Sequence, residues 1–88
     1  MILYAGNLSR STTRQELIAL FAPFGDIIRI KVMADRITRR SHGYAYIDMS
    51  DAGGAADAVE KLNCTSFMGS FIMVGPANIK RLHEIDWS

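Results

Sequence analysis

Apolar residues along this chain switch repeatedly between the two-residue spacing of a β-strand and the three- and four-residue spacing of an α-helix. The switches predict the order strand, helix, strand, strand, helix, strand. Two βαβ units that fold together in this order form an antiparallel four-stranded sheet with both helices on one face. The other face of the sheet is then open to solvent. The predicted strands are Ile2–Ala5, Ile27–Met33, Gly43–Met49 and Phe71–Val74.

Each helix is predicted from a capping residue followed by apolar residues at helical spacing. Thr13 and Glu16 have the spacing of a capping box, and Gly25 closes the first helix. Ser50 or Asp51 can cap the second helix. The fold class is therefore α+β, in the ferredoxin-like βαββαβ arrangement. The predicted apolar faces are Leu17, Leu20, Phe21 and Phe24 in the first helix, and Ala52, Ala55, Val59 and Leu62 in the second.

Three segments carry weaker patterns. Gly53 and Gly54 are expected to weaken the first turn of the second helix. Residues Phe67–Ser70 are either a turn or a short edge strand. Residues 78–88 have only partial helical spacing. We therefore predict one domain over residues 1–77, followed by a C-terminal tail over residues 78–88.

Length and composition exclude several classes of protein. A chain of 88 residues with 49% hydrophobic and 22% charged residues is typical of one soluble globular domain. No apolar run approaches the roughly 20 residues that a membrane helix needs. Cys64 is the only cysteine, which excludes an internal disulfide and a cysteine-based zinc site and suits a reducing compartment. We expect a cytoplasmic protein without a metal or a cofactor.

Positive charge is concentrated in one segment, although the net charge of the chain is only +1. Between Arg29 and His42 there are five basic residues and one acid, whereas the rest of the chain has five basic residues and eight acids. Such a segment can be a local phosphate-binding surface or a solvated loop that happens to be basic. Charge alone does not separate the two interpretations. The basic residues are Arg29, Lys31, Arg36, Arg39 and Arg40.

Two motifs concentrate aromatic residues on the predicted open face. Because side chains alternate along a strand, Tyr44 and Tyr46 share a face, and pairing of the first and third strands places Tyr4 beside them. The segments Leu3–Leu8 (LYAGNL) and His42–Met49 (HGYAYIDM) resemble the paired signatures of the RNA recognition motif family. The resemblance extends from Ile2 to about Ala77. It implies that Tyr4 and Tyr46 stack bases, and that Tyr44 packs between sugars or nearby.

Further contacts are predicted around the tyrosines. Asn7 at the end of the first strand is a candidate for a base or backbone contact, and Lys31 for a phosphate or base contact. His42 stands where the family usually has Lys or Arg, so Arg39 and Arg40 could supply the missing charge. Phe71 and Met73 could support a base or a partner protein. The predicted RNA-binding residues are Tyr4, Tyr44, Tyr46, Asn7, Lys31, Arg39, Arg40, His42 and Met73.

The resemblance implies a binding protein for single-stranded RNA, with single-stranded DNA as a second candidate. Stacking on an aromatic side chain contributes about 1–3 kcal/mol per base and depends little on sequence. A protein interaction module or homodimer that uses the same aromatic face is the alternative. We expect a monomer, with a weak homodimer as the second option. An enzyme is not expected, because no pairing of nucleophile and base is visible and the loop after the first strand is too sparse to form a phosphate cradle.

The ending of the second motif also resembles one group of relatives. Ile47-Asp48-Met49, together with a chain that begins at its first strand, is similar to the single-domain bacterial members of the family. The same residues could belong to a fragment of a larger eukaryotic protein. The preferred RNA sequence is not readable from these motifs, because it depends on the geometry of loops and tail.

Overall fold

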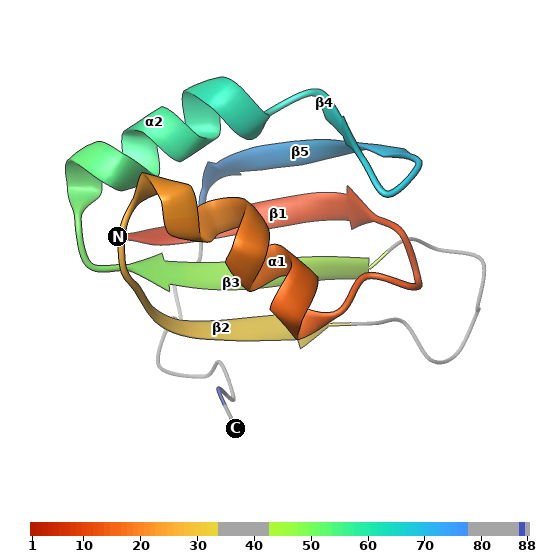
Figure 1. The fold of residues 1–88 in the computed structure, drawn as a ribbon, viewed down its shortest axis with the longest axis horizontal. Coiled ribbons are helices and arrows are strands. Elements are labelled where there is room, and N and C mark those ends of the chain that lie inside the picture. Colours follow the sequence, from red (N-terminus) through yellow and green to blue (C-terminus); the bar gives the residue numbers. More distant parts are fainter. Residues whose placement is uncertain (34–42, 78–86, 88) are drawn as a thin grey trace.

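The computed structural model describes residues 1–33, 43–77 and Trp87. Within them the strands form an antiparallel sheet in the order β2-β3-β1-β5-β4. Both α-helices lie on one side of this sheet, as Figure 1 shows. The α+β prediction is therefore confirmed. The elements are β1 (Ile2–Leu8), α1 (Arg14–Phe21), a 3-10 turn η1 (Ala22–Phe24), β2 (Ile27–Met33), β3 (Gly43–Met49), α2 (Ala52–Leu62), β4 (Thr65–Phe67) and β5 (Ser70–Pro76).

The predicted number of strands was wrong, because the described residues contain five strands and not four. The additional strand is β4, which pairs with β5 in a hairpin that ends at Phe67 and Ser70. Met68 and Gly69 connect them with φ angles of 53° and 83°. Two successive left-handed residues are typical of the tightest hairpin turns. A strand of three residues is too short to show alternation, so the sequence pattern left it undecided.

The helix starts follow the predicted capping residues. The Oγ1 atom of Thr13 accepts a hydrogen bond of 3.3 Å from the Glu16 amide. Asp51, rather than Ser50, caps α2, because its carboxylate accepts hydrogen bonds from the amides of Gly53 and Gly54 at 3.3 and 3.1 Å. Such caps satisfy amides that have no partner inside the helix.

The core lies between the sheet and the two helices. The predicted apolar face of α2 was wrong at Ala52, which is exposed, and Gly54 and Ala58 are buried in addition to Ala55 and Leu62. At Gly54 an added Cβ would lie 1.9 Å from the carbonyl oxygen of Phe24. The missing side chain therefore lets α2 approach η1 closely. The fully buried large side chains are Phe21, Leu3, Leu8, Leu17, Ile47, Met49 and Ile72.

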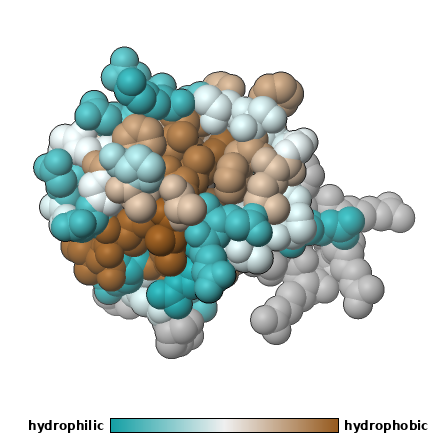
Figure 2. Space-filling view, viewed as in Figure 1, coloured by the Kyte–Doolittle hydropathy of each residue, from teal (hydrophilic) through white to brown (hydrophobic). Residues whose placement is uncertain are grey.

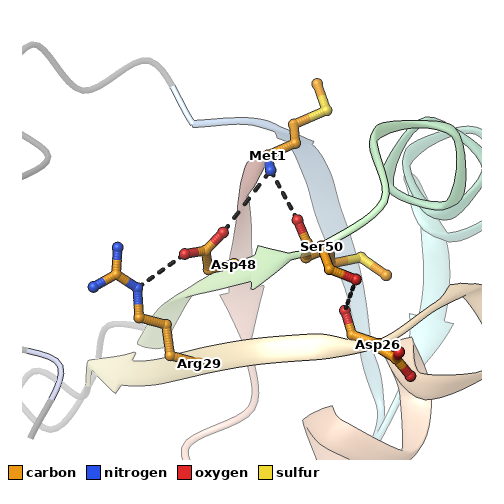
Figure 3. A network of polar contacts seen from close by, with 6 residues as sticks. Met1, Asp26, Arg29, Asp48 and Ser50 are labelled. Carbon is orange, nitrogen blue, oxygen red and sulfur yellow. Dashed lines mark hydrogen bonds and ion pairs between the residues drawn. The ribbon is translucent and has the colours of Figure 1, made fainter.

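A network of polar contacts connects neighbouring ends of β1, β2 and β3 (Figure 3). The Ser50 amide donates to the carbonyl oxygen of Asp26 at 3.1 Å, which joins the start of β2 to the end of β3. Arg29 Nε donates to Asp48 Oδ2 at 2.9 Å across the same two strands. The amino nitrogen of Met1 donates to the carbonyl oxygen of Met49 at 2.8 Å and lies 3.8 Å from Asp48 Oδ1.

The helix-bearing side of the sheet is mixed in polarity. Figure 2 shows hydrophilic residues beside hydrophobic ones on this side. No helix among the described residues is long and apolar enough to cross a membrane. Side chains that alternate with the buried residues of β1 and β3 point away from the helices, to the opposite face. That face contains the predicted site.

Candidate nucleic-acid interface

The three tyrosines lie on the helix-free face of the sheet. Their strand neighbours Leu3, Ala5, Ala45 and Ile47 are fully buried on the helix side. Tyr4 pairs directly with Tyr46 across β1 and β3. Tyr44 is exposed, and Tyr4 and Tyr46 are half-buried. The alternation therefore places all three rings where a ligand could reach them, as the sequence pattern predicted.

The three rings form one contiguous group, which we call the tyrosine cluster (Tyr4, Tyr44 and Tyr46). Their centroids are 5.8 Å apart for Tyr4 and Tyr44, 5.9 Å for Tyr4 and Tyr46, and 5.8 Å for Tyr44 and Tyr46. The corresponding interplanar angles are 32°, 56° and 83°. Separations of about 4.5–7 Å with tilted or edge-on planes are those that aromatic pairs prefer. Each ring thus restricts the others and still presents an exposed surface.

The Tyr4 ring packs over Gly6. Gly6 lies two residues after Tyr4 and therefore faces the same side of β1. An added Cβ at Gly6 would lie 2.6 Å from Tyr4 Oη, 2.7 Å from Cε1 and 2.9 Å from Cζ. The Tyr4 ring therefore occupies the space above this glycine. This role of Gly6 was not predicted, although a glycine two residues after an exposed aromatic residue is a signal that the sequence contains.

Burial and the neighbouring rings make the Tyr46 hydroxyl harder to ionise. Partial burial is the main cause that raises the pKa of its hydroxyl above the ordinary value of about 10, and the neighbouring Tyr44 and Tyr4 raise it further. Burial disfavours the phenolate, and phenolates on the other two rings would repel it. The neutral form of Tyr46 is therefore favoured in the folded cluster.

This pKa predicts how folding stability depends on alkaline pH. The folded protein holds the Tyr46 proton more tightly than the unfolded chain does. The contribution of this proton to the free energy of unfolding is therefore complete below about pH 10, and it is lost as pH rises through the pKa of Tyr46 in the folded protein. Urea unfolding between about pH 9 and 11 measures the loss. Tyr46→Phe should remove this part of the pH dependence. An identical pH profile for Tyr46→Phe and wild type would contradict the assignment.

Lys31 and Met73 flank the tyrosine cluster on the neighbouring strands. Lys31 lies opposite Tyr46 in the pairing of β2 with β3, and Met73 lies opposite Gly6 in the pairing of β1 with β5. Directly opposed residues share a face and lie within side-chain reach of each other. Met73 is 59% exposed. The structure thus brings both of these predicted residues to the cluster.

Asn7 lies at the end of this surface and contacts the protein itself. Its φ angle is 59°, and it lies in the irregular register between Ala5 and Leu8. Its Nδ2 donates a hydrogen bond of 2.7 Å to the carbonyl oxygen of Phe71. Asn7 therefore joins the bulge of β1 to β5. The predicted contact of Asn7 with RNA stays a prediction.

Arg29 lies on the same face, but its charge is compensated within the protein. Its guanidinium pairs with Asp48 and also lies 4.3 Å from the centroid of the Trp87 ring, a cation–π contact. Asp48 was not among the predicted site residues, although it follows Tyr46 by two positions and therefore faces the same side. The carboxylate reduces the positive potential at this end of the open face.

Several predicted residues lie outside the described part of the chain. They are Arg39, Arg40 and His42, together with the tail apart from Trp87. Their predicted contacts stay predictions. Among the residues that the structure does describe, no group of three His, Cys, Asp or Glu side chains could hold a metal ion.

Comparison with protein families matches residues 3–73 to the family described as the RNA recognition motif. The glycine-rich RNA-binding protein 2, mitochondrial, of Arabidopsis thaliana is 38% identical over 76 residues, which are 86% of this chain and 48% of that protein. The putative RNA-binding protein RbpE of Nostoc sp. is 31% identical over 77 residues, 88% of this chain and 78% of that protein. The chain thus spans about half of the Arabidopsis relative and most of the bacterial one.

Solved structures agree with this assignment of the fold. The structure of the Rna15 RRM with bound RNA (GU) superimposes with a TM-score of 0.77 at 29% identity, covering 93% of this chain and 90% of that chain. A Sxl-lethal protein–RNA complex superimposes with a TM-score of 0.76 at 28% identity, covering 86% and 47%. Both similar structures are described as RNA complexes.

Proposed function

The chain belongs to the RNA recognition motif family, and from this premise we propose that it binds single-stranded RNA on the helix-free face of its sheet. The main observation behind the proposal is the tyrosine cluster, whose three ring centroids lie 5.8–5.9 Å apart outside the core. Every base has a π-face, so exposed aromatic rings bind single strands with little regard to sequence. The RNA complexes among the similar structures support the same ligand class.

Within the proposal the tyrosines divide their roles. Tyr4 and Tyr46 are directly opposed on the two central strands and serve as the two base platforms. Tyr44 packs edge-on against Tyr46 and supports the bound strand beside them. Stacking then contributes about 1–3 kcal/mol for each base. With a net charge of +1, the chain relies more on stacking than on attraction of phosphate.

A titration of labelled, short single-stranded RNA of random sequence tests the function. We expect saturable binding that weakens as salt rises, because contacts to phosphate release counterions. Duplex RNA of the same composition should bind more weakly, since its bases are not available for stacking. A chain that binds no single strand at low salt but elutes as a dimer would instead support the protein interaction module.

Substitution of Lys31 separately tests the electrostatic contribution to RNA binding. Lys31→Gln should weaken binding to all sequences similarly and reduce the steepness of the salt dependence by roughly 0.7, the contribution of one phosphate contact on a single strand. Binding curves at several salt concentrations measure this slope. Lys61→Gln is the matched control, because Lys61 lies exposed on α2 on the opposite side of the sheet. Equal slopes for the two variants would remove Lys31 from the proposed interface.

Other features of the function also stay proposals. Single-stranded DNA is the second candidate ligand, and a competition between RNA and DNA of one sequence decides between them. We propose a monomer that binds without catalysing a reaction. A cytoplasmic location stays a prediction, since the relatives include a mitochondrial protein and a polyadenylate-binding protein described as cytoplasmic and nuclear.

A further inference from the structure

Phe71 is the most prominent exposed side chain of the hairpin formed by β4 and β5. It is 71% exposed, the largest fraction among the exposed large hydrophobic residues of the described chain. Ile72 and Val74 on the same strand are 0% and 4% exposed and face the helices. Phe71 and Met73 alternate with them and therefore face the same side as the tyrosine cluster.

Phe71 continues the apolar surface of the cluster. Met73 lies directly opposite Gly6, and the Tyr4 ring occupies the space above Gly6. Met73 is thus the neighbour of that ring across the strands. Phe71 follows along β5, at the distance of about 6.6–6.8 Å that separates alternate residues of a strand. The surface therefore runs from the tyrosines over Met73 to Phe71 without an intervening charge on β5.

The backbone of Phe71 is fixed by contacts with β1 on one side and with β4 on the other. The regular pairing of β1 with β5 ends at Gly6 and Met73. Beyond it, Asn7 Nδ2 donates to the Phe71 carbonyl oxygen at 2.7 Å, and on the other side Phe71 pairs with Ser66 of β4. A side chain on a backbone already held in place loses less freedom when a ligand binds. The position therefore suits a stacking platform.

The size and charge of this surface favour a base over a protein partner. Residues Thr65–Pro76 contain no charged side chain, and only Phe71, Met73 and the turn residue Met68 are large exposed hydrophobics there. Stable protein interfaces use about 20–30 residues on each side. A nucleobase is covered by one aromatic ring. We propose that Phe71 stacks one further base of the bound strand, an inference that rests on the proposed function and extends its footprint onto β5.

A length series of single-stranded RNA tests this inference. Random-sequence RNAs are lengthened by one nucleotide at a time at either end, and their affinities are measured with wild type, Phe71→Ala and Phe71→Leu. We expect wild type to gain about five- to 150-fold when a base first reaches Phe71. Both variants should lack this gain and bind shorter RNAs as wild type does. Their salt dependence should be unchanged, because no phosphate contact is lost.

The controls separate this inference from the proposed function. Met68→Ala removes an exposed hydrophobic side chain from the turn of the same hairpin and should keep the gain with length. A gain that Phe71→Ala and Phe71→Leu both retain would overturn the role of Phe71 and leave RNA binding by the tyrosines intact. A wild-type dimer that Phe71→Ala dissociates, with RNA binding unchanged, would assign the residue to a protein interface. No RNA binding by wild type at any length would overturn the proposed function itself.

Discussion

We expect alanine at both Tyr4 and Tyr46 to lower the affinity for single-stranded RNA by at least about 30-fold. The expectation follows from a loss of about 1–3 kcal/mol for each stacked base, summed over two platforms. Tyr44→Ala alone should have a smaller effect, because the proposed binding mode stacks bases on Tyr4 and Tyr46 and not on Tyr44. Fluorescence anisotropy with labelled RNA of random sequence measures all three affinities at one salt concentration, so that only stacking differs between the variants.

The matched control keeps the rings and removes only the hydroxyls. Phenylalanine at both Tyr4 and Tyr46 retains the π-faces and should bind RNA within a few-fold of wild type. Because both side chains lie outside the fully buried core, the alanine variant should remain folded, and circular dichroism checks this. If the double alanine variant is folded and binds like wild type, the bases do not stack on the tyrosine cluster.

Gly54→Ala should destabilise the fold by about 2 kcal/mol or more. The added methyl group would lie 1.9 Å from the carbonyl oxygen of Phe24, so α2 and η1 must move apart. Overpacking of this kind costs about 1–3 kcal/mol, and more where backbone must shift. For a domain of this size the expected decrease of Tm is at least about 8 °C. Thermal unfolding followed by circular dichroism measures it.

The neighbouring glycine provides the control for this effect. At Gly53 an added Cβ would meet only the carboxylate oxygens of Asp51, at 3.7 Å, which is an ordinary contact. Alanine is also the better helix former by about 0.5–1 kcal/mol. Gly53→Ala should therefore leave Tm unchanged or raise it. Equal Tm values for the two alanine variants would show that the close packing of α2 on η1 does not require Gly54.

The different packing of Gly53 and Gly54 was not predictable from the sequence. Both were expected only to weaken the first turn of α2, because helix propensity depends on local sequence alone. The contact between Gly54 and Phe24 joins residues that lie 30 positions apart, and nothing in the spacing of either segment indicates it. Ala52 is exposed, although its spacing assigned it to the buried face of α2.

The tyrosine cluster was predictable because it depends on periodicity. Alternation along β3 assigns Tyr44 and Tyr46 to one face, and the order of elements places β1 beside β3. The contacts around the cluster were not predictable from the sequence. The ion pair of Arg29 with Asp48 and the hydrogen bond from the Asn7 amide to the Phe71 carbonyl oxygen join residues that lie 19 and 64 positions apart.

The most direct test of the proposed function observes the tyrosine rings during binding. Unlabelled single-stranded RNA is titrated into protein whose tyrosine rings and backbone amides are isotope-labelled, and both sets of resonances are followed by NMR. The ring signals of Tyr4 and Tyr46 should shift in proportion to saturation and show contacts to base protons, with smaller changes at Tyr44. Ring signals that stay unchanged at saturation, with shifts confined to α1 and α2, would contradict stacking on the open face.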